Sequence, residues 1–433
     1  MFQRARNLEI NGGTFNVIEG GVAASRPGLQ KLLEHSMPDA FHDSSTRWPP
    51  PRCHEGTCED LIATVIDWGC HTGPDRPPIL WAYGPFGVGK SALAQTCAEA
   101  LASRGKLGAS LFFSRSNMQN NPKHVFNSIS LQIAISYPRF GSIVDRSIQS
   151  RPTLLNASLP VLFNDLLSKP LQESRTHAVT DGLEGLAIIV DGLNELEDAD
   201  MQLVIIDLVA ASVREGATPF RWLITSRPEP HITRLMNSSS IYPSVFGLEL
   251  PVSRESDRDI SLYLTAELTK LRKRSGLPKS WPRKRDIQAL VERAAGLWIY
   301  ATNALNFISI RSINDPVSQL RIILEQGLDG SASLENYHAI SPLAGMASHY
   351  TLILAQIPRA IKSTALKIFL LWEISSREPS VPITFPIAWV LGLSQVQFRG
   401  ILDPLRAVLK VEDQDDDFNS VKIYFYHPAF QII

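Results

Sequence analysis

The stretch ILWAYGPFGVGKSALAQ, residues 79–95, decides the fold. Its first five residues are apolar and predict a buried strand, while the residues from Lys90 onward have the composition of a helix. Between the two stands G-x-x-x-x-G-K-S, the pattern of a phosphate-binding loop, in the strand-to-helix context that such a loop requires. The sequence therefore predicts a loop that wraps around the phosphates of a nucleotide.

Each residue type in this loop has a chemical reason. Glycines let backbone N–H groups curl around phosphate oxygens, and the N-terminus of the following helix adds a positive dipole. Lys90 supplies a positive charge to the β- and γ-phosphates, and Ser91 offers a hydroxyl group to Mg²⁺. The predicted nucleotide-binding residues are Gly84, Pro85, Phe86, Gly87, Val88, Gly89, Lys90, Ser91 and Ala92.

Short apolar runs alternate with amphipathic stretches from residue 53 to residue 250. One such stretch, KSALAQTCAEALA, places Leu93, Cys97 and Leu101 four residues apart, on one face of a helix. Near-continuous apolar strands between helices are typical of a parallel sheet covered by helices. The predicted fold class is α/β, a P-loop NTPase sheet followed by a helical domain and a winged-helix domain. The runs expected to form strands are 79–84, 109–114, 186–192, 221–226 and 246–250.

The remaining segments have weaker patterns. Residues 7–20, NLEINGGTFNVIEG, contain two extended pieces around a turn signal at residues 11–13. A weakly ordered hairpin or tail, and a β-motif that pairs with itself or a partner, both fit that pattern. The predicted organisation is an N-terminal β-motif or disordered tail (1–25), a linker with a short helix (26–52), the nucleotide-binding domain (53–250), a helical domain (251–330) and a winged-helix-like domain cut short at its C-terminal end (331–433).

The run IIVDGLNEL, residues 188–196, places acids at the end of a predicted strand. Asp191 is expected to hold Mg²⁺ through water, and Glu195 to orient or deprotonate an attacking water. A buried strand that ends in a capping Asp is the ordinary alternative. Asn194 brings no charge to a metal, so it is interpreted as a brake on hydrolysis.

A third group of polar residues lies in RWLITSRPE, residues 221–229. A strand that ends in Thr225-Ser226-Arg227 would place polar groups at the carboxyl edge of the sheet, where ligands of such folds bind. Arg227 would then sense or stabilise the γ-phosphate. An ordinary surface arginine is the alternative.

Composition narrows the function classes. The 42 basic and 43 acidic residues nearly cancel, so bulk charge does not indicate binding to nucleic acid or to an anionic membrane. No apolar run reaches the roughly 18–20 residues that span a bilayer, and the start lacks the apolar core of a signal peptide. Four cysteines in 433 residues make no disulfide framework, which favours a reducing, cytoplasmic setting.

Two weaker patterns have ordinary explanations. Cys53, Cys58 and Cys70, with the histidines beside two of them, match no familiar zinc spacing. The basic run KLRKRSGLPKSWPRKR, residues 270–285, has the composition of a nuclear-localisation or nucleic-acid patch, but a solvated helix end and loop is the commoner origin of such a run.

Taken in order, the motifs resemble the NACHT-type nucleotide-binding proteins of the STAND class, especially the large fungal set with a nephrocystin-like N-terminal nucleotide-binding region. The residues that carry the resemblance are RCHEGTCEDL, ILWAYGPFGVGKSALAQ, ASLFFSR, IIVDGLNEL, WLITSRPEPHI, IQALVERAAGLWIYATNALNFI and YFYHPAF, preceded by LEINGGTFNVIEGG.

The resemblance implies a regulatory ATPase that uses ATP, ADP and Mg²⁺. On the family pattern, ADP holds the three domains closed, and exchange for ATP releases them and allows homo-oligomerisation. Lys90, Asp191, Glu195 and Arg227 would be catalytic, Ser91 and Asp191 would hold Mg²⁺, and His427 would touch the ADP phosphate. The N-terminal segment would contact an unidentified protein partner, and neither nucleic acid nor a membrane is expected as a partner.

Two departures from the family pattern bear on function. Asn194 stands where the family usually has Asp, which lowers the expected rate of turnover. Family members also continue into a C-terminal repeat array. A nucleotide-binding scaffold without turnover therefore remains a second interpretation, and an ordinary P-loop kinase, for which no substrate-binding lid is evident, remains a third.

Overall fold

The computed structural model describes residues 26–71, 73, 76–114, 119–175, 182–309, 315–325, 357–376, 384–402, 405, 409–412 and 422–425. The predicted β-motif at 7–20 and His427 lie outside these residues, so both stay predictions.

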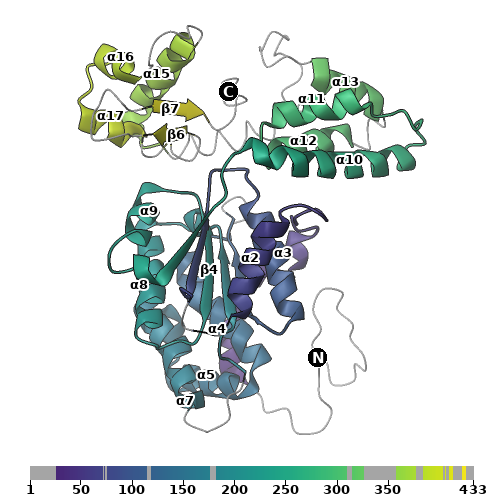
Figure 1. The fold of residues 1–433 in the computed structure, drawn as a ribbon. Helices are drawn as coiled ribbons and strands as arrows, with labels where there is room; N and C mark the ends of the chain where they lie inside the picture. Colours follow the sequence, from purple (N-terminus) through teal and green to yellow (C-terminus); the bar gives the residue numbers. More distant parts are fainter. Residues whose placement is uncertain are drawn as a thin grey trace.

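A five-stranded parallel sheet forms the centre of the larger part of the molecule (Figure 1). The strand order is β2-β3-β4-β1-β5, so β1 lies between two strands that come much later in the sequence. This arrangement confirms the predicted α/β class, with a phosphate-loop pattern directly after a central strand. The strands are β1 (Ile79–Tyr83), β2 (Leu107–Phe112), β3 (Ala187–Asp191), β4 (Arg221–Ser226) and β5 (Val245–Glu249).

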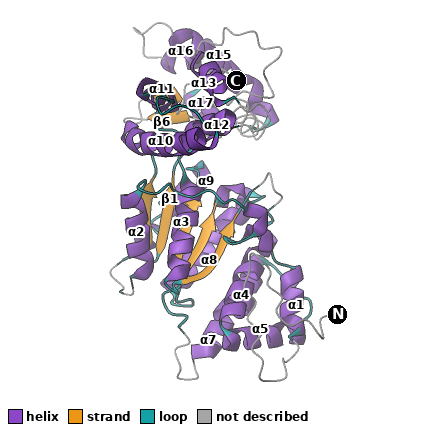
Figure 2. Cartoon of the chain, turned by 90° about the vertical axis from the view of Figure 1, so that its right-hand side faces the viewer, coloured by secondary structure: helices purple, strands orange, loops and turns teal. Residues whose placement is uncertain are grey.

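Helices cover both faces of the sheet, as Figure 2 shows. Alternate residues of β3 pack on opposite sides: Ile189 packs in one core with Leu93, and Ile188 packs in the other core with Ile205. The first face carries α2 (Glu59–Cys70) and α3 (Lys90–Ser103). The second carries α4 (Val125–Ser136), α5 (Pro138–Ser150), α6 (Leu159–Phe163), α7 (Lys169–Arg175), α8 (Ala199–Arg214) and α9 (Pro230–Met236).

Short helical turns connect these elements. They are η1 (Pro38–Ala40), η2 (Ser45–Arg47), η3 (Pro122–His124), η4 (Leu154–Asn156), η6 (Leu193–Glu195), η7 (Tyr242–Ser244) and η8 (Arg254–Ser256), and the wider turn η5 (Asn164–Ser168) joins α6 to α7.

The C-terminal half is helical and ends in a hairpin, as the sequence predicts. The helical part contains α10 (Asp257–Arg274), α11 (Lys284–Ala294), α12 (Trp298–Ile308) and α13 (Pro316–Glu325). Beyond it lie α15 (Arg359–Ser376), α16 (Thr384–Val390) and α17 (Gln395–Leu402), then β6 (Leu409–Glu412) and β7 (Lys422–Phe425). The last two strands are antiparallel, which gives the helix-helix-helix-hairpin order of a winged helix. Within the described ranges, none of the helices combines the length and apolarity that crossing a bilayer demands.

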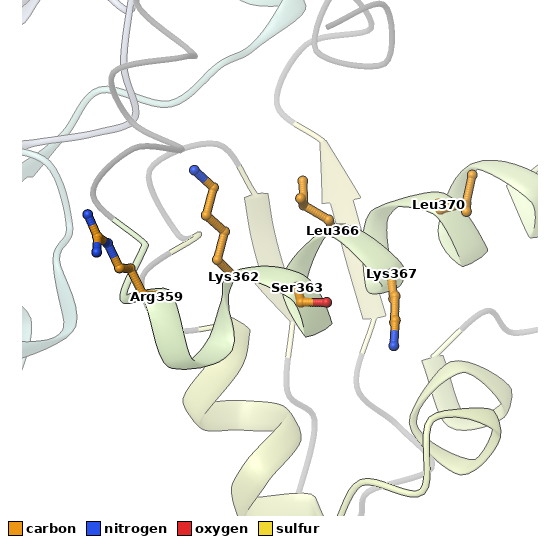
Figure 3. A pocket seen from close by; sticks show the side chains of 6 residues that line it. All are labelled: Arg359, Lys362, Ser363, Leu366, Lys367 and Leu370. Atoms are coloured by element: carbon orange, nitrogen blue, oxygen red, sulfur yellow. The ribbon is translucent and has the colours of Figure 1, made fainter.

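One helix of this C-terminal part borders a cavity of about 540 Å³ (Figure 3). Its described lining residues all belong to α15 and combine three cationic side chains with two leucines and a serine. They are Arg359, Lys362, Ser363, Leu366, Lys367 and Leu370. The cavity shares no residue with the predicted nucleotide site.

Residues 26–52, predicted to be a linker, pack against the α/β unit. The helix α1 (Pro27–Glu34) contacts both α4 and α5, and its Leu32 is fully buried. Gly28 allows a close approach, because a Cβ atom there would stand 2.5 Å from the carbonyl oxygen of Asp145. The carboxylate of Asp145 also accepts the backbone N–H of Leu29 at 3.0 Å. This segment is therefore part of the α/β unit.

The outer edge of β2 is capped by a side chain. The amide of Gln132, on α4, accepts the backbone N–H of Ser110 at 2.9 Å and donates to the carbonyl oxygen of Ser110 at 3.1 Å. Ser110 itself is fully buried. The Gln132 amide thus takes the place of a further strand, whose backbone would otherwise satisfy these groups.

We predict that Gln132→Ala lowers the free energy of unfolding by about 1–3 kcal/mol, because two buried backbone groups lose their partner. Urea denaturation measures the change. Gln288→Ala is the matched control, since the Gln288 amide donates to Glu292 on the exposed face of α11 and the loss of this bond should change stability by less than about 0.5 kcal/mol. Equal stability of the two variants would contradict the capping role.

Candidate functional site

The predicted phosphate loop joins β1 to α3, and its backbone requires glycine at three positions. A Cβ atom on Gly84 would stand 2.2 Å from the carbonyl oxygen of Leu250. Gly87 and Gly89 adopt φ angles of +83° and +97°, in the left-handed region where other residues are strained. The loop therefore has the tight, concave backbone that the motif predicts.

Lys90 lies at the start of α3, with its ammonium group turned back onto the loop. Its Nζ donates to the carbonyl oxygens of Gly84 (2.8 Å) and Pro85 (2.7 Å). Burial lowers the pKa of Lys90 to about 7, and the positive charge of Arg227 acts in the same direction. An anion bound in the loop would offer this ammonium group a stronger acceptor than two neutral carbonyls.

Asp191 ends β3 with a buried carboxylate that is 3% exposed. Its Oδ1 accepts the hydroxyl of Thr225 at 2.6 Å, and the same hydroxyl oxygen accepts the backbone N–H of Gly192 at 2.9 Å. The hydroxyl of Ser91, at the start of α3, lies near enough to act on the pKa of this carboxylate. Burial raises the pKa of Asp191, while the two hydroxyl groups and the nearby Lys90 ammonium act to lower it. These contacts join the ends of β3, β4 and α3 at one carboxylate.

Glu195 and Arg227 form an ion pair beside this carboxylate. The guanidinium of Arg227 donates to Glu195 Oε1 at 2.7 Å, and it lies 5.6 Å from the ring centroid of Phe86. Only 8% of Arg227 is exposed, which rules out the alternative of an ordinary surface arginine.

Asn194 connects the two members of this pair. Its Oδ1 accepts the backbone N–H of Arg227 at 2.9 Å, and its Nδ2 donates to Glu195 Oε1 at 3.3 Å. The side chain is 5% exposed, so its hydrogen bonds are shielded from water. The amide therefore holds the turn after β3 against the turn after β4, a role that the sequence pattern did not indicate.

The first turn of α12 lies directly on the phosphate loop. The backbone N–H of Ile299 donates to the carbonyl oxygen of Gly87 at 3.1 Å. A Cβ atom on Gly87 would stand 2.5 Å from Ile299 Cγ2, and one on Gly89 would lie 3.8 Å from Trp298 Cδ1. The loop thus offers a carbonyl to an N–H group that helix geometry leaves without an intrahelical partner.

The structure brings together most of the residues that the sequence singled out. Those that meet at the carboxyl edge of the sheet are Lys90, Ser91, Asp191, Glu195 and Arg227. The contact of Ile299 with the loop was missed, because one apolar residue in a helix gives no local signal of its partner.

The residues present fit a nucleotide and Mg²⁺. The positive φ angles of Gly87 and Gly89 curl the loop backbone in the way that lets successive N–H groups surround phosphate oxygens. A serine hydroxyl and a carboxylate, Ser91 and Asp191, are already adjacent and are oxygen ligands of the kind that Mg²⁺ prefers. Lys90 and Arg227 add two positive charges on the same side.

One comparison with known proteins covers this region. The family model described as Nephrocystin 3, N-terminal, matches residues 56–227, a span that begins before α2 and ends at Arg227. Among curated proteins, none matches the chain in sequence.

Three solved structures are among those similar to this chain. Cdc6p from Pyrobaculum aerophilum is 15% identical, with 88% of this chain and 93% of that chain covered and a TM-score of 0.42. AMPPCP-bound DnaA from Aquifex aeolicus is 12% identical (86% and 92% covered, TM-score 0.35), and PCH-2 of C. elegans is 12% identical (69% and 71% covered, TM-score 0.34). At these scores the likeness adds nothing to what the strand order and the loop establish.

Proposed function

We propose that this protein is an ATP- and ADP-dependent signalling switch of the STAND class, with a NACHT-type nucleotide-binding domain. Slow ATP hydrolysis controls its open and closed states and its self-association. Its resemblance to fungal proteins extends the proposal to innate immunity or self/non-self recognition. The observation that carries the proposal is the hydrogen bond from Ile299 on α12 to Gly87 in the phosphate loop.

This contact couples nucleotide binding to the helical part of the chain. Gly87 lies in the middle of the loop, and its φ of +83° leaves little freedom to move without changing the loop's shape. Phosphates bind to such a loop through its backbone N–H groups. A change in the number of bound phosphates that shifts the loop therefore shifts the start of α12. A metabolic P-loop enzyme has no need of this connection.

The site also supports slow rather than fast hydrolysis. Mg²⁺, when bound, would polarise the phosphates and neutralise charge. Glu195, the candidate base, already accepts hydrogen bonds from Arg227 and Asn194. The Oε1 atom that would face an attacking water is thus already engaged by two donors. A γ-phosphate in the loop would compete for the Arg227 guanidinium and so weaken its hydrogen bond to Glu195.

A nucleotide-binding scaffold without turnover is the second candidate function. The buried amide of Asn194 favours it, because the amide adds no charge for a metal and ties Glu195 in place. Single-turnover hydrolysis that disappears in Glu195→Gln would exclude the scaffold.

We predict that the purified protein retains or binds ADP and that Lys90→Ala weakens this binding by about 2 kcal/mol, or roughly thirtyfold in Kd. The reason is the loss of the ammonium group that faces the phosphates. Calorimetric titration with ADP gives the Kd. Lys270→Ala is the matched control, since Lys270 is an exposed lysine of α10 that pairs with Glu267. This variant should bind ADP with the affinity of the parent protein. Absence of ADP and ATP binding in the parent protein would refute the switch.

We predict that Ile299→Ala speeds ADP release several-fold, because the side chain that packs on Gly87 is lost and the start of α12 is held less firmly against the loop. Stopped-flow displacement of a fluorescent ADP gives the rate. Ile299→Val keeps both atoms that contact Gly87 and should release ADP at the parent rate. The coupling is wrong if alanine and valine behave alike.

We predict that Asn194→Asp lowers the unfolding free energy of the nucleotide-free protein by about 1–2 kcal/mol, since a donor to Glu195 becomes a like charge. With Mg²⁺ and ATP the same charge draws the metal, and turnover should rise. Thermal unfolding and phosphate release measure the two effects. Glu195→Gln serves as the background for the rate, and an Asn194→Asp rate at or below the parent's would refute the brake.

A further inference from the structure

Arg47 lies next to the nucleotide site although it belongs to none of the site's motifs. Its guanidinium carbon lies 3.7 Å from the ring centroid of Phe112, the last residue of β2. Phe112 is the register partner of Asp191 in the parallel pair of β2 and β3. Register partners in a parallel pair point to the same face of a sheet, so Arg47 lies on the face where the Asp191 carboxylate lies.

A second contact fixes Arg47 to α3. Its guanidinium donates to Gln95 Oε1 at 2.6 Å, and Gln95 is fully buried. Gln95 follows Ser91 by four residues and therefore lies one helical turn beyond it on the same face of α3. Since Ser91 lies near enough to Asp191 to act on the pKa of its carboxyl group, Arg47 and Asp191 lie along the same stripe of this helix.

The segment around Arg47 is held in place along its length. The Gln95 amide nitrogen donates to the carbonyl oxygen of His42 at 2.9 Å and to Glu99 Oε1 at 2.6 Å. Further along, Arg52 Nε donates to both oxygens of Glu99, at 2.9 and 2.8 Å. Residues 41–52, here called the upstream strap, thus follow α3 through a continuous polar network.

The electrostatic surroundings agree with this geometry. Burial lowers the pKa of Arg47, and the negative charges of Asp191 and Glu99 act against that effect. The guanidinium remains a cation under any ordinary condition.

We propose that Arg47 is a positioning residue of the nucleotide site, which places a fixed positive charge beside Asp191 and fastens the upstream strap to α3. This inference rests on the proposed nucleotide binding. The charge compensates Asp191 when Mg²⁺ is absent, so that the carboxylate repels bound phosphates less. It also repels Mg²⁺ when the metal arrives. The residue therefore lowers the dependence of ADP binding on Mg²⁺.

The test compares ADP binding with and without the metal. The quantity is the ratio of the Kd for ADP in EDTA to the Kd for ADP in Mg²⁺, both from calorimetric titration of the full chain. In Arg47→Gln we expect this ratio to rise about tenfold, because ADP alone binds less tightly and Mg²⁺ is no longer repelled. Arg47→Lys, which keeps the charge, should restore the ratio toward the parent value. A purely structural defect weakens both affinities equally and leaves the ratio unchanged.

Arg52→Gln is the matched control, since Arg52 lies on the same strap but bonds to Glu99, two helical turns beyond Ser91. Its ratio should equal that of the parent. Should Arg47→Gln fail to fold, Arg47→Met takes its place, because a methionine of similar length still covers the Phe112 ring. An unchanged ratio in the neutral variant overturns the role of Arg47. Absence of ADP binding in the parent protein overturns the proposed function instead.

Discussion

The burial of one carboxylate, that of Asp191, is the constraint on which the rest of the site depends. Removal of its water raises its pKa and would leave a destabilising charge if nothing compensated it. The compensating groups come from separate places: hydroxyls from Ser91 and Thr225, and positive charges from Lys90 and Arg47. Because α3, β4 and the upstream strap each contribute one or more of these groups, the carboxylate is satisfied only when all three are assembled. Fold and site therefore depend on the same contacts.

Glu195 takes part in a second set of linked interactions. Its Oε1 accepts hydrogen bonds from both Arg227 and Asn194. Arg227 is the shared group, since it pairs with Glu195 here and faces the same side as the phosphate loop. Under the proposed function, an anion in the loop and the Glu195 carboxylate would compete for one guanidinium. Release of Glu195 would then depend on what the loop holds. Asn194 also binds the Arg227 backbone, which keeps the guanidinium near both acceptors.

The sequence predicted well those elements whose residue types are constrained by local chemistry. The strand β4 spans Arg221–Ser226, the same six residues that the sequence pattern indicated, because the apolar centre of a strand buried on both faces, here residues 222–224, is a clear signal. The phosphate loop was equally clear, since its backbone needs glycine where φ is positive. Asn194 shows the limit of such reasoning: the pattern gave its residue type and its place among acids. It did not give the partners of its amide, which are the adjacent Glu195 carboxylate and the backbone of Arg227, more than thirty residues away and directly after β4.

The contacts that the sequence could not predict are those that would make the molecule a switch. Arg47 precedes the loop by about forty residues, and Ile299 follows it by about two hundred. No periodic pattern around either residue indicates a contact with the loop. Both act next to the phosphate site, one through a charge beside Asp191 and one through a backbone bond to Gly87. The site is thus held between an upstream and a downstream segment. A ligand that changes the charge or shape of the site would act on both segments at once. Such coupling requires only that the ligand contacts two states of the protein with different free energies. An enzyme that merely processes a small molecule gains nothing from this arrangement, whereas a switch requires it.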